Sequence, residues 1–370
     1  MNRIKVALIA GKMVGGGVES ILMSINKYID KNKFEVDLLV DEDSKIVPEK
    51  EIKSLGINLI YIPPYQSIIR YLWALRNLFS KRKYDIVHAN ISALNVFPLA
   101  VAYFCHVKVR ISHNHNLISP NAGVIKNTVK WLLAQVSNVF PNYRIAPTYK
   151  TGAWVFKKKK FFVIKNGIEP ERFVFNLDER KAIRNKLNID SDKILIGSFG
   201  RLISSKNIFF ALKIMEELDN KYKLLIIGSG VEEAKLKNYV ISKRDLRGKI
   251  IFLPSDKDVS YYYSALDLYI FPSTAEAFGM ASVESQANGL YTLVSTGVPD
   301  ESKVLDELFI KIKTYDIQEW KETIMKIRYT ELSQRLQISN KSQNKVFDSK
   351  KMVKEIEELY TYAVKTQGKM

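Results

Sequence analysis

Residues 271–289 read FPSTAEAFGMASVESQANG and predict a strand that passes through a loop into a helix. The strand is the short apolar run Leu268–Phe271, which Pro272 terminates. The helix starts near Gly279, and Gly289 stops it. Such a strand-loop-helix unit is the building block of parallel sheets covered by helices.

Two glutamates lie on this unit with seven residues between them. Glu276 is expected on the loop, and Glu284 one to two turns into the helix. This spacing can direct both carboxylates into one crevice at the carboxyl edge of a sheet, where open α/β proteins bind ligands and helix N-termini offer N–H groups to phosphate. The alternative is a pair of solvated acids on a surface helix.

The rest of the chain repeats the alternation of strands and helices and predicts an α/β protein with parallel sheets in two halves. A charged segment with few apolar residues, from Asn166 to Asp192, marks the boundary. We therefore expect domains at 1–165 and 166–348, with a final helix, Ser349–Val364, that packs back on the first domain. The strands are expected at Ile4–Ala10, Phe34–Val40, Asn58–Ile62, Asp85–Ala89, Lys108–Ser112, Tyr143–Ala146, Phe161–Ile164, Lys193–Phe199, Lys223–Ile227, Lys249–Leu253, Leu268–Phe271 and Thr292–Ser295.

The composition narrows the class of protein. The 370 residues contain one cysteine, Cys105, which excludes a disulfide framework and fits a reducing compartment. No uninterrupted apolar run approaches the ~18 residues of a membrane span.

The net charge is +18, and residues 86–168 hold 11 Lys and Arg but no Asp or Glu. Such a one-sided field favours an anionic partner: nucleic acid, an anionic membrane or a phosphorylated substrate.

Glycines follow the first predicted strand at positions 15–17 and precede a helix. Glycine allows a close backbone approach, and the helix N-terminus favours an anion. Neither this run nor Gly228-Ser229-Gly230 matches G-x-G-x-x-G, so a nicotinamide or flavin fingerprint is poorly supported. Asn166-Gly167 indicates a tight turn.

Arg201 and Lys206 follow the strand expected at Lys193–Phe199. An Arg fork and a Lys point charge suit a diphosphate whose charge rises as it leaves. Two surface cations flanking a helix are the alternative.

Histidines His88, His113 and His115 follow strands of the first half, and one of the last two could hydrogen-bond a sugar hydroxyl. A zinc site would need further ligands. Two D-x-D pairs, Asp190–Asp192 and Asp256–Asp258, could hold a divalent metal beside a nucleotide. Asp258 fits a helix cap better, and the other pair lies in the linker, so no metal site is expected.

Together these motifs resemble the glycosyltransferase family 4 enzymes of GT-B fold, in particular those of bacterial exopolysaccharide and capsule synthesis. The resemblance covers nearly the whole chain through the order of its motifs. They are GGGVE (15–19), DIVHAN (85–90), RISHNHN (110–116), KNGIEPERF (165–173), FGRLISSKN (199–207), IIGSG (226–230), the paired glutamates and FDSKKMVKEIEELY (347–360).

The resemblance implies two Rossmann-like, doubly wound parallel-sheet domains facing across a cleft, and it implies roles for individual residues. The catalytic set would be Glu276 at the donor sugar, Arg201 and Lys206 at the departing nucleotide, and His113 or His115 near the acceptor. Donor binding would involve Gly16, Gly17, Asn166, Gly167, the amides of Phe278, Gly279 and Met280, and Glu284 at the ribose. Leu253-Pro254 and Ala277 replace Leu-Gly and glycine of the family pattern, which leaves the donor sugar open.

The implied activity is retaining transfer of a sugar from a nucleotide-diphosphate donor, such as a UDP-sugar, to a lipid-linked saccharide without a metal or other cofactor. The enzyme would act in cell-surface polysaccharide synthesis. The acid-free block, with aromatic residues interleaved, further predicts a cytoplasmic protein held peripherally on the inner face of the membrane. Two alternatives remain: a sugar-nucleotide 2-epimerase of the same architecture, and a basic nucleic-acid-binding protein without enzymatic activity.

Overall fold

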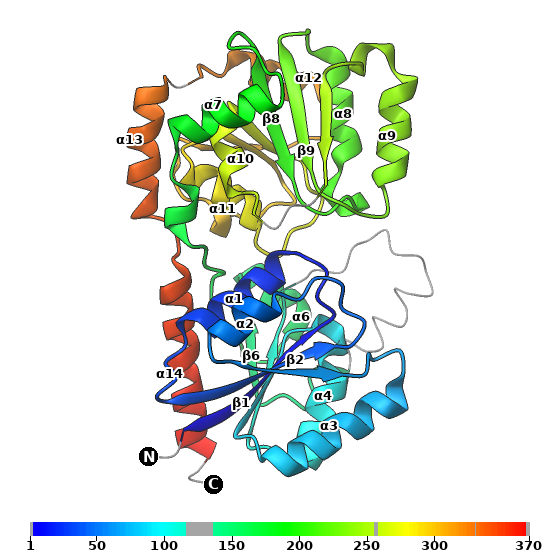
Figure 1. The fold of residues 1–370 in the computed structure, drawn as a ribbon, viewed down its shortest axis with the longest axis vertical. Coiled ribbons are helices and arrows are strands. Elements are labelled where there is room, and N and C mark those ends of the chain that lie inside the picture. Colours follow the sequence, from blue (N-terminus) through cyan, green and yellow to red (C-terminus); the bar gives the residue numbers. More distant parts are fainter. Residues whose placement is uncertain (1–2, 116–135, 255–257, 330, 368–370) are drawn as a thin grey trace. The chain divides into compact units, whose positions relative to one another are not determined.

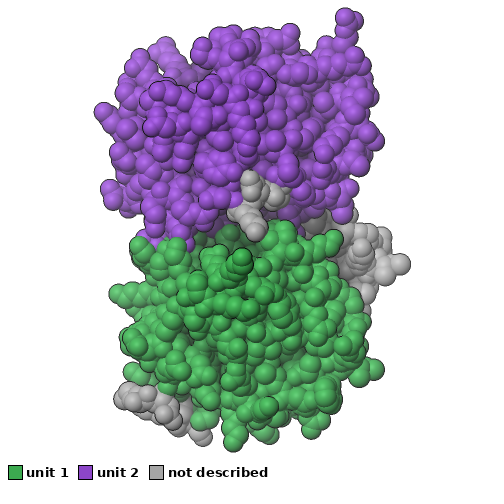
Figure 2. Space-filling model, viewed as in Figure 1, with its two compact units in different colours: residues 1–167, 349–370 green, residues 168–348 purple. Residues whose placement is uncertain are grey.

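The computed structural model describes residues 3–115, 136–254, 258–329 and 331–367. The chain divides into two compact units, which we describe separately (Figures 1 and 2). Unit 1 comprises residues 1–167 and 349–370, and unit 2 comprises residues 168–348. The boundary lies two residues from the position expected from sequence.

Unit 1 is built on a parallel sheet whose described strands follow the order β3-β2-β1-β4-β5-β6-β7. The strands are β1 (Ile4–Gly11), β2 (Phe34–Asp41), β3 (Asn58–Ile62), β4 (Ile86–Ala89), β5 (Val109–His113), β6 (Tyr143–Ala146) and β7 (Phe162–Val163). The helices are α1 (Gly17–Tyr28), α2 (Glu49–Ser54), α3 (Ile68–Arg82), α4 (Val96–Phe104), α6 (Tyr149–Phe156) and α14 (Ser349–Gln367), with a 3-10 turn at Ser92–Asn95.

Unit 2 has the same architecture, with a parallel sheet in the order β10-β9-β8-β11-β12-β13. Its strands are β8 (Ile194–Phe199), β9 (Tyr222–Ile227), β10 (Ile250–Leu253), β11 (Leu268–Phe271), β12 (Thr292–Ser295) and β13 (Phe309–Ile312). Its α-helices are α7 (Leu177–Lys186), α8 (Ile208–Glu217), α9 (Glu233–Ser242), α10 (Ser260–Ala265), α11 (Met280–Ala287), α12 (Ile317–Lys326) and α13 (Leu332–Gln343). Short 3-10 turns lie at Pro170–Phe173, Ser204–Lys206, Arg244–Leu246 and Asp300–Ser302.

Side chains alternate between the two faces of a strand, and the consecutive residues 6–9 of β1 are all buried, so both faces of the unit 1 sheet are covered there. Ala7 and Ile9 of β1 join one core cluster with Leu75 of α3 and Leu99 of α4. Buried side chains of α14 such as Ile356 belong to the helix pair α1–α14, which packs together (Figure 1).

Helix α14 is tied to unit 1 by polar contacts as well as by apolar packing. Ser24 Oγ of α1 lies 3.1 Å from Ser349 Oγ, and the Asp30 N–H donates to Glu357 at 2.5 Å. The last helix of the chain is therefore an integral part of unit 1, as the sequence suggested.

Three features of the fold differ from the sequence expectations. Strand β13 was missed, because its sequence, Phe-Ile-Lys-Ile, is short and carries a lysine. Asn166-Gly167 was predicted to form a tight turn, which is wrong: no turn is assigned there, and the chain continues to a parallel bridge between Ile168 and Asp348. The final helix runs to Gln367, three residues beyond the expected Val364. Within the described residues, no helix is long and apolar enough to cross a bilayer.

Candidate functional site

Each sheet has one point where the strand order reverses. In unit 1 it lies between β1 and β4, and in unit 2 between β8 and β11. Successive connections leave such a point toward opposite faces of the sheet, which opens a crevice at the carboxyl ends of the two strands. The loops after β1, β8 and β11, together with the helices α1 and α11, contain nine of the thirteen site residues predicted from sequence.

In unit 2 the loops after β8 and β11 are hydrogen-bonded to each other. The Thr274 N–H donates to the Ser205 carbonyl at 2.8 Å. Lys206 Nζ donates to Glu276 Oε1 at 2.6 Å, and the two side chains are 19% and 12% exposed. The Lys206 ammonium also lies 4.8 Å from the centroid of the Phe271 ring. The structure thus brings two of the predicted catalytic residues into contact at the switch point.

Glycines shape these loops for steric reasons. A Cβ on Gly228 would lie 1.9 Å from the Gly200 carbonyl oxygen, and one on Gly230 would lie 2.2 Å from that of Leu202. Glycine is therefore required for the loop after β9 to approach the loop after β8. Gly279 caps α11 with φ = +95°, a conformation that side chains rarely adopt.

Glu284 lies on α11 and is held by a tyrosine that the sequence did not single out. Tyr263 Oη donates to Glu284 Oε2 at 2.7 Å. Removal from water raises the pKa of Glu284, while the bond from Tyr263 and the charges of Arg172 and Lys206 oppose that rise. Lys206 and Glu284 therefore lie within electrostatic reach of each other. No sequence signal separates Tyr263 from its neighbours in the run Tyr261–Tyr263.

The N-terminus of α11 points its first N–H groups out of the helix, because these groups have no intrahelical partner. The Phe278 side chain is buried, so this residue can offer only its backbone to a ligand. Met280 is half-buried at the first helical position. Arg201, at the start of the loop after β8, is exposed.

In unit 1 the glycine loop leads into α1 at the carboxyl end of β1. Gly15 has φ = +86°, Gly16 is extended, and the helix begins at Gly17. Glu19, in the first turn, accepts a hydrogen bond from the Val14 N–H at 2.7 Å. One loop amide is thus already engaged by a carboxylate of the protein.

Three histidines gather at the carboxyl edge of this sheet: His88 lies in β4, His113 ends β5, and His115 follows two residues later. His88 Nε2 lies 3.2 Å from His113 Nδ1, and the rings of His113 and His115 lie 3.9 Å apart. Two partners were missed by sequence: Tyr360 of α14, 2.6 Å from His88 Nδ1, and Asn90, 3.0 Å from His115 Nε2.

Burial keeps these three imidazoles neutral. It lowers the pKa of His88 and of His115 to about 3, and His115 further opposes the protonation of His88. The pKa of His113 is lowered well below its usual value by burial and by both neighbouring histidines. At neutral pH each ring therefore carries one proton.

Asn166 and Gly167 end unit 1. Asn166 is buried, and its Oδ1 has no hydrogen-bond partner among the described residues. The Gly167 N–H is directed at the Met352 sulfur of α14, 3.2 Å away. A role of these two residues in donor binding stays a prediction.

The D-x-D pairs have structural contacts. Asp258 accepts from the Ser260 N–H at 2.9 Å at the start of α10 and pairs with Arg172 at 3.0 Å. Asp192 pairs with Lys193, and Asp256 lies outside the described residues. Within the described ranges, no group of three or more His, Cys, Asp or Glu is arranged to hold a metal ion.

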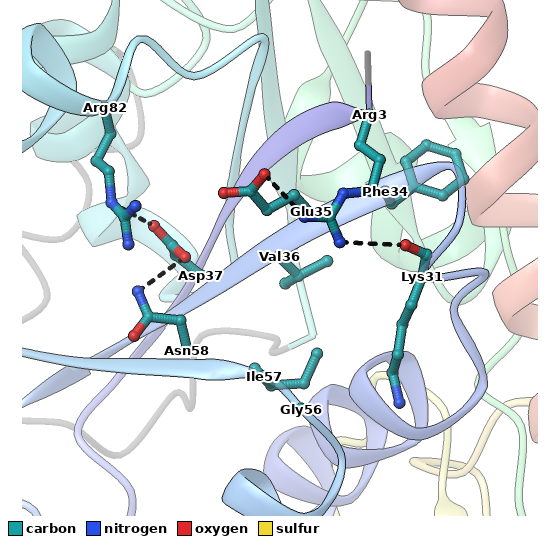
Figure 3. Close-up of a pocket in the computed structure, with 10 residues that line it drawn as sticks. All are labelled: Arg3, Lys31, Phe34, Glu35, Val36, Asp37, Gly56, Ile57, Asn58 and Arg82. Atoms are coloured by element: carbon teal, nitrogen blue, oxygen red, sulfur yellow. Dashed lines mark hydrogen bonds and ion pairs between the residues drawn. The ribbon is translucent and has the colours of Figure 1, made fainter. Parts of the chain in front are cut away.

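A cavity of about 150 Å³ lies beside β1, β2 and β3 in unit 1 (Figure 3). Four of its charged groups form two ion pairs: Asp37 with Arg82 at 3.2 Å and Glu35 with Arg3 at 3.4 Å. Lys31 and Asn58 lie before or at the starts of β2 and β3, so the cavity faces the amino ends of these strands. It is remote from the carboxyl edge and is not part of the candidate site.

Comparison with known proteins gives two family matches and a consistent set of relatives. Residues 15–172 match "Glycosyltransferase Family 4", and residues 179–345 match "Glycosyl transferases group 1". The chain is 26% identical to the putative glycosyltransferase EpsF of Bacillus subtilis over 84% of each chain. It is 23% identical to the capsular polysaccharide biosynthesis glycosyltransferase CapM of Staphylococcus aureus, over 94% of this chain and 98% of that protein.

A third relative is the UDP-Gal:alpha-D-GlcNAc-diphosphoundecaprenol alpha-1,3-galactosyltransferase of Escherichia coli, with 22% identity over 80% of each chain. Among solved structures, HepE of Anabaena, crystallised with UDP and glucose, superimposes with a TM-score of 0.81. It is 18% identical, with 97% of this chain and all of that chain covered.

Proposed function

The chain belongs to the glycosyltransferases of GT-B fold that act in polysaccharide biosynthesis, with a family 4 domain followed by a group 1 domain, and we propose that it transfers a sugar from a nucleotide-diphosphate donor with retention of configuration. The observation that carries the proposal is the contact between Lys206 and Glu276 at the switch point of unit 2. Charge, hydrogen-bonding groups and a helix N-terminus gather there, as a diphosphate sugar requires.

Lys206 and Arg201 neutralise the diphosphate as it leaves. The bond between the anomeric carbon and the diphosphate oxygen breaks, the anomeric carbon bonds to the acceptor hydroxyl oxygen, and the proton of that hydroxyl passes to the departing diphosphate. Negative charge grows on the leaving group before the proton arrives, so a fixed cation is worth more in that state than in the bound substrate. Glu276 orients Lys206 before donor binds and accepts hydrogen bonds from donor-sugar hydroxyls afterwards. Glu284, held by Tyr263, accepts from the ribose hydroxyls.

The donor is a UDP-sugar and the acceptor a lipid-diphosphate-linked saccharide. Support for the donor comes from HepE, whose structure contains UDP and glucose, and from the E. coli relative, whose name specifies UDP-Gal. The same relative acts on a diphosphoundecaprenol-linked sugar, which supports the acceptor class. His113 or His115 contacts a saccharide hydroxyl, and Gly16 and Gly17 approach the diphosphate.

A surface of unit 1 around α6 docks on the inner, anionic face of the cytoplasmic membrane. Tyr149, Lys150, Trp154 and Phe162 are exposed there, and so is the run Lys157–Lys160. Basic residues near an anionic leaflet contribute about 1 kcal/mol each, and exposed aromatic rings insert at the interface. Arg144 does not contribute, because it is buried and donates to the carbonyls of Asn138 and Pro141. Lys126 and Lys130 lie outside the described residues.

Transfer is tested with the purified full chain. Saturation-transfer NMR against a panel of nucleotide sugars identifies the donor, and product formation is then measured with and without a lipid-diphosphate-linked saccharide. We expect product only when both substrates are present. Turnover of the donor alone into an isomer would indicate the 2-epimerase, and binding to random DNA without affinity for any nucleotide sugar would indicate the nucleic-acid-binding protein.

Membrane docking is tested by vesicle flotation. The wild type should float with phosphatidylglycerol vesicles and not with phosphatidylcholine vesicles, and Lys158→Glu/Lys159→Glu should reduce flotation more than tenfold. Lys181→Glu/Lys186→Glu, which makes the same charge change on exposed residues of α7, is the matched control. Equal recovery with both kinds of vesicle would contradict docking.

A further inference from the structure

Tyr360, His88 and His113 form one hydrogen-bonded row inside unit 1. His88 of β4 and His113 of β5 lie on the same face of the sheet, since His88 is paired with Ile111, two residues before His113. Tyr360 of α14 packs edge-on against the His88 ring, at 88°. All three side chains are fully buried.

The direction of the first hydrogen bond follows from what a buried phenol needs. Burial raises the pKa of Tyr360, so the phenol keeps its proton. That O–H needs an acceptor, and among the described residues His88 Nδ1 lies 2.6 Å away. Tyr360 therefore donates, and Nδ1 of the neutral His88 must be unprotonated.

The second hydrogen bond has its direction fixed by the first. His88 carries its single proton on Nε2 and donates it to His113 Nδ1, 3.2 Å away. The neutral His113 then carries its own proton on Nε2. This N–H is buried and has no hydrogen-bond partner among the described residues. A buried donor of this kind is costly unless a ligand accepts from it.

Asn90 fixes the tautomer of the neighbouring ring, that of His115. Its amide nitrogen donates to the carbonyls of Ile9 and His88, both at 3.3 Å, so its Oδ1 is the acceptor of the 3.0 Å bond to His115 Nε2. His115 therefore carries its proton on Nε2, and its Nδ1 is a bare acceptor. Within the described part of the chain this atom is also buried without a partner.

We propose that Tyr360 and His88 are positioning residues that hold His113 as the Nε2–H tautomer, so that His113 and His115 together present one donor and one acceptor to a single saccharide hydroxyl. A hydroxyl accepts one hydrogen bond and donates another, and it matches two adjacent rings of opposite polarity. The hydroxyl belongs to the donor sugar or to the acceptor saccharide. The inference rests on the proposed function for its ligand, but the tautomer assignment does not depend on it.

Tyr360→Phe tests the row, because it removes the phenol oxygen and keeps the ring. The matched control is Tyr362→Phe, which alters an exposed tyrosine two residues along the same helix. The chain has four histidines, so long-range ¹⁵N–¹H spectra of the ligand-free protein can be assigned by replacing them one at a time. We expect His113 as the Nε2–H tautomer in the wild type and in Tyr362→Phe, and a mixture of tautomers in Tyr360→Phe. His113 protonated on Nδ1 in the wild type, or an unchanged spectrum in Tyr360→Phe, would overturn the assignment.

Transfer kinetics test whether the pair His113 and His115 recognises a saccharide hydroxyl. Tyr360→Phe should lower kcat/KM about tenfold, the usual size of one hydrogen-bond loss, while Tyr362→Phe retains the wild-type value. A rise in KM for the nucleotide sugar alone assigns the hydroxyl to the donor, and a rise for the saccharide alone assigns it to the acceptor. Deoxy analogues complete the test, since the variant and the wild type should use the analogue that lacks the recognised hydroxyl equally well.

The two hypotheses fail in different ways. If the wild type transfers sugar and Tyr360→Phe is equally active, hydroxyl recognition by the histidine pair is overturned while the proposed function stands. If the wild type transfers no sugar from any nucleotide donor, the proposed function fails and the saccharide ligand fails with it. The tautomer spectra, recorded without substrate, still decide whether the row exists.

Discussion

Lys206 and Glu276 are 70 residues apart in sequence and 2.6 Å apart in space. Both side chains are largely withdrawn from water, at 19% and 12% exposure, and they meet where the order of strands in unit 2 reverses. An exposed ion pair contributes little to stability. A pair at this place holds an ammonium ready for an anionic ligand.

Replacing Lys206 by Ala should lower kcat by roughly 100-fold or more at saturating donor, since one well-placed charge at a leaving group is worth about 3–4 kcal/mol. Arg201→Ala should act in the same direction. Steady-state transfer rates check both variants. Lys213→Ala removes an exposed lysine of α8 and serves as the control. Near-normal turnover of Lys206→Ala would exclude its role at the leaving group and leave the ion pair a structural contact.

Glu284→Ala should mainly weaken binding of the nucleotide, because Glu284 is proposed to accept hydrogen bonds from the ribose. Tyr263→Phe should weaken it about tenfold, since the carboxylate loses the donor at 2.7 Å that orients it. Titration calorimetry with UDP measures both effects. Glu322→Ala, which removes an exposed carboxylate of α12, should bind UDP like the wild type. Undiminished affinity in Glu284→Ala would place the ribose elsewhere.

Gly228→Ala should destabilise the protein by about 1–3 kcal/mol, because the added methyl group meets the Gly200 carbonyl oxygen at 1.9 Å. Gly16→Ala should change stability by less than about 0.5 kcal/mol, since Gly16 is extended and the nearest atom to its Cβ is 3.8 Å away. Urea unfolding of the two variants checks the contrast. Equal unfolding midpoints would mean that the loop after β9 relaxes without cost.

Acidification should destabilise unit 1 through its buried histidines. Their pKa values lie below that of the unfolded chain, about 6.5, so the unfolded state binds protons that the folded state excludes. The free energy of unfolding therefore falls as the pH drops from about 6.5 toward about 3, by up to about 1.36 kcal/mol per pH unit for each histidine. Above about pH 7 the effect is absent.

His115→Gln isolates one of these contributions, because its amide can still donate to Asn90 while no longer titrating. Urea unfolding at pH 7.5 and pH 5.0 should show a smaller pH slope than in the wild type. His106→Asn removes an exposed histidine at φ = +58° and should retain the wild-type slope. Burial also raises the pKa of Asp41 to about 6, so this carboxyl stabilises the folded state as the pH falls, opposite to the histidines. The wild type and both variants share this effect, so it cancels when their pH slopes are compared.

Local patterns predicted most of the fold. Apolar runs ended by glycine, proline or polar residues located β6, β11 and β12 at their observed bounds, and the glutamate spacing placed Glu276 on a loop and Glu284 in α11. Strand β13 was not predicted, because its four residues, which include a lysine, are too few to show a periodic pattern. Asn166-Gly167 was read as a turn because turn propensity is local, whereas the bridge from Ile168 to Asp348 connects distant segments.

The residues that hold the site in position were less accessible to sequence reasoning. Tyr263 and Tyr360 act through single hydrogen bonds to residues 21 and 272 positions away. Their neighbours in sequence are also tyrosines or helix formers, so nothing local distinguishes them. Contacts of this kind depend on the packing of whole elements, which a motif does not encode.

Unit 1 consists of two stretches of polypeptide with all of unit 2 between them. A ribosome releases the chain from its N-terminus, so the nascent unit 2 can complete its fold while unit 1 still lacks α14. The His88 side chain of β4 therefore stays uncovered until α14 emerges, which happens only after the whole of unit 2 has been synthesised. A stop codon in place of Ser349 would consequently deprive unit 1 of α14 while leaving the segment that forms unit 2 complete.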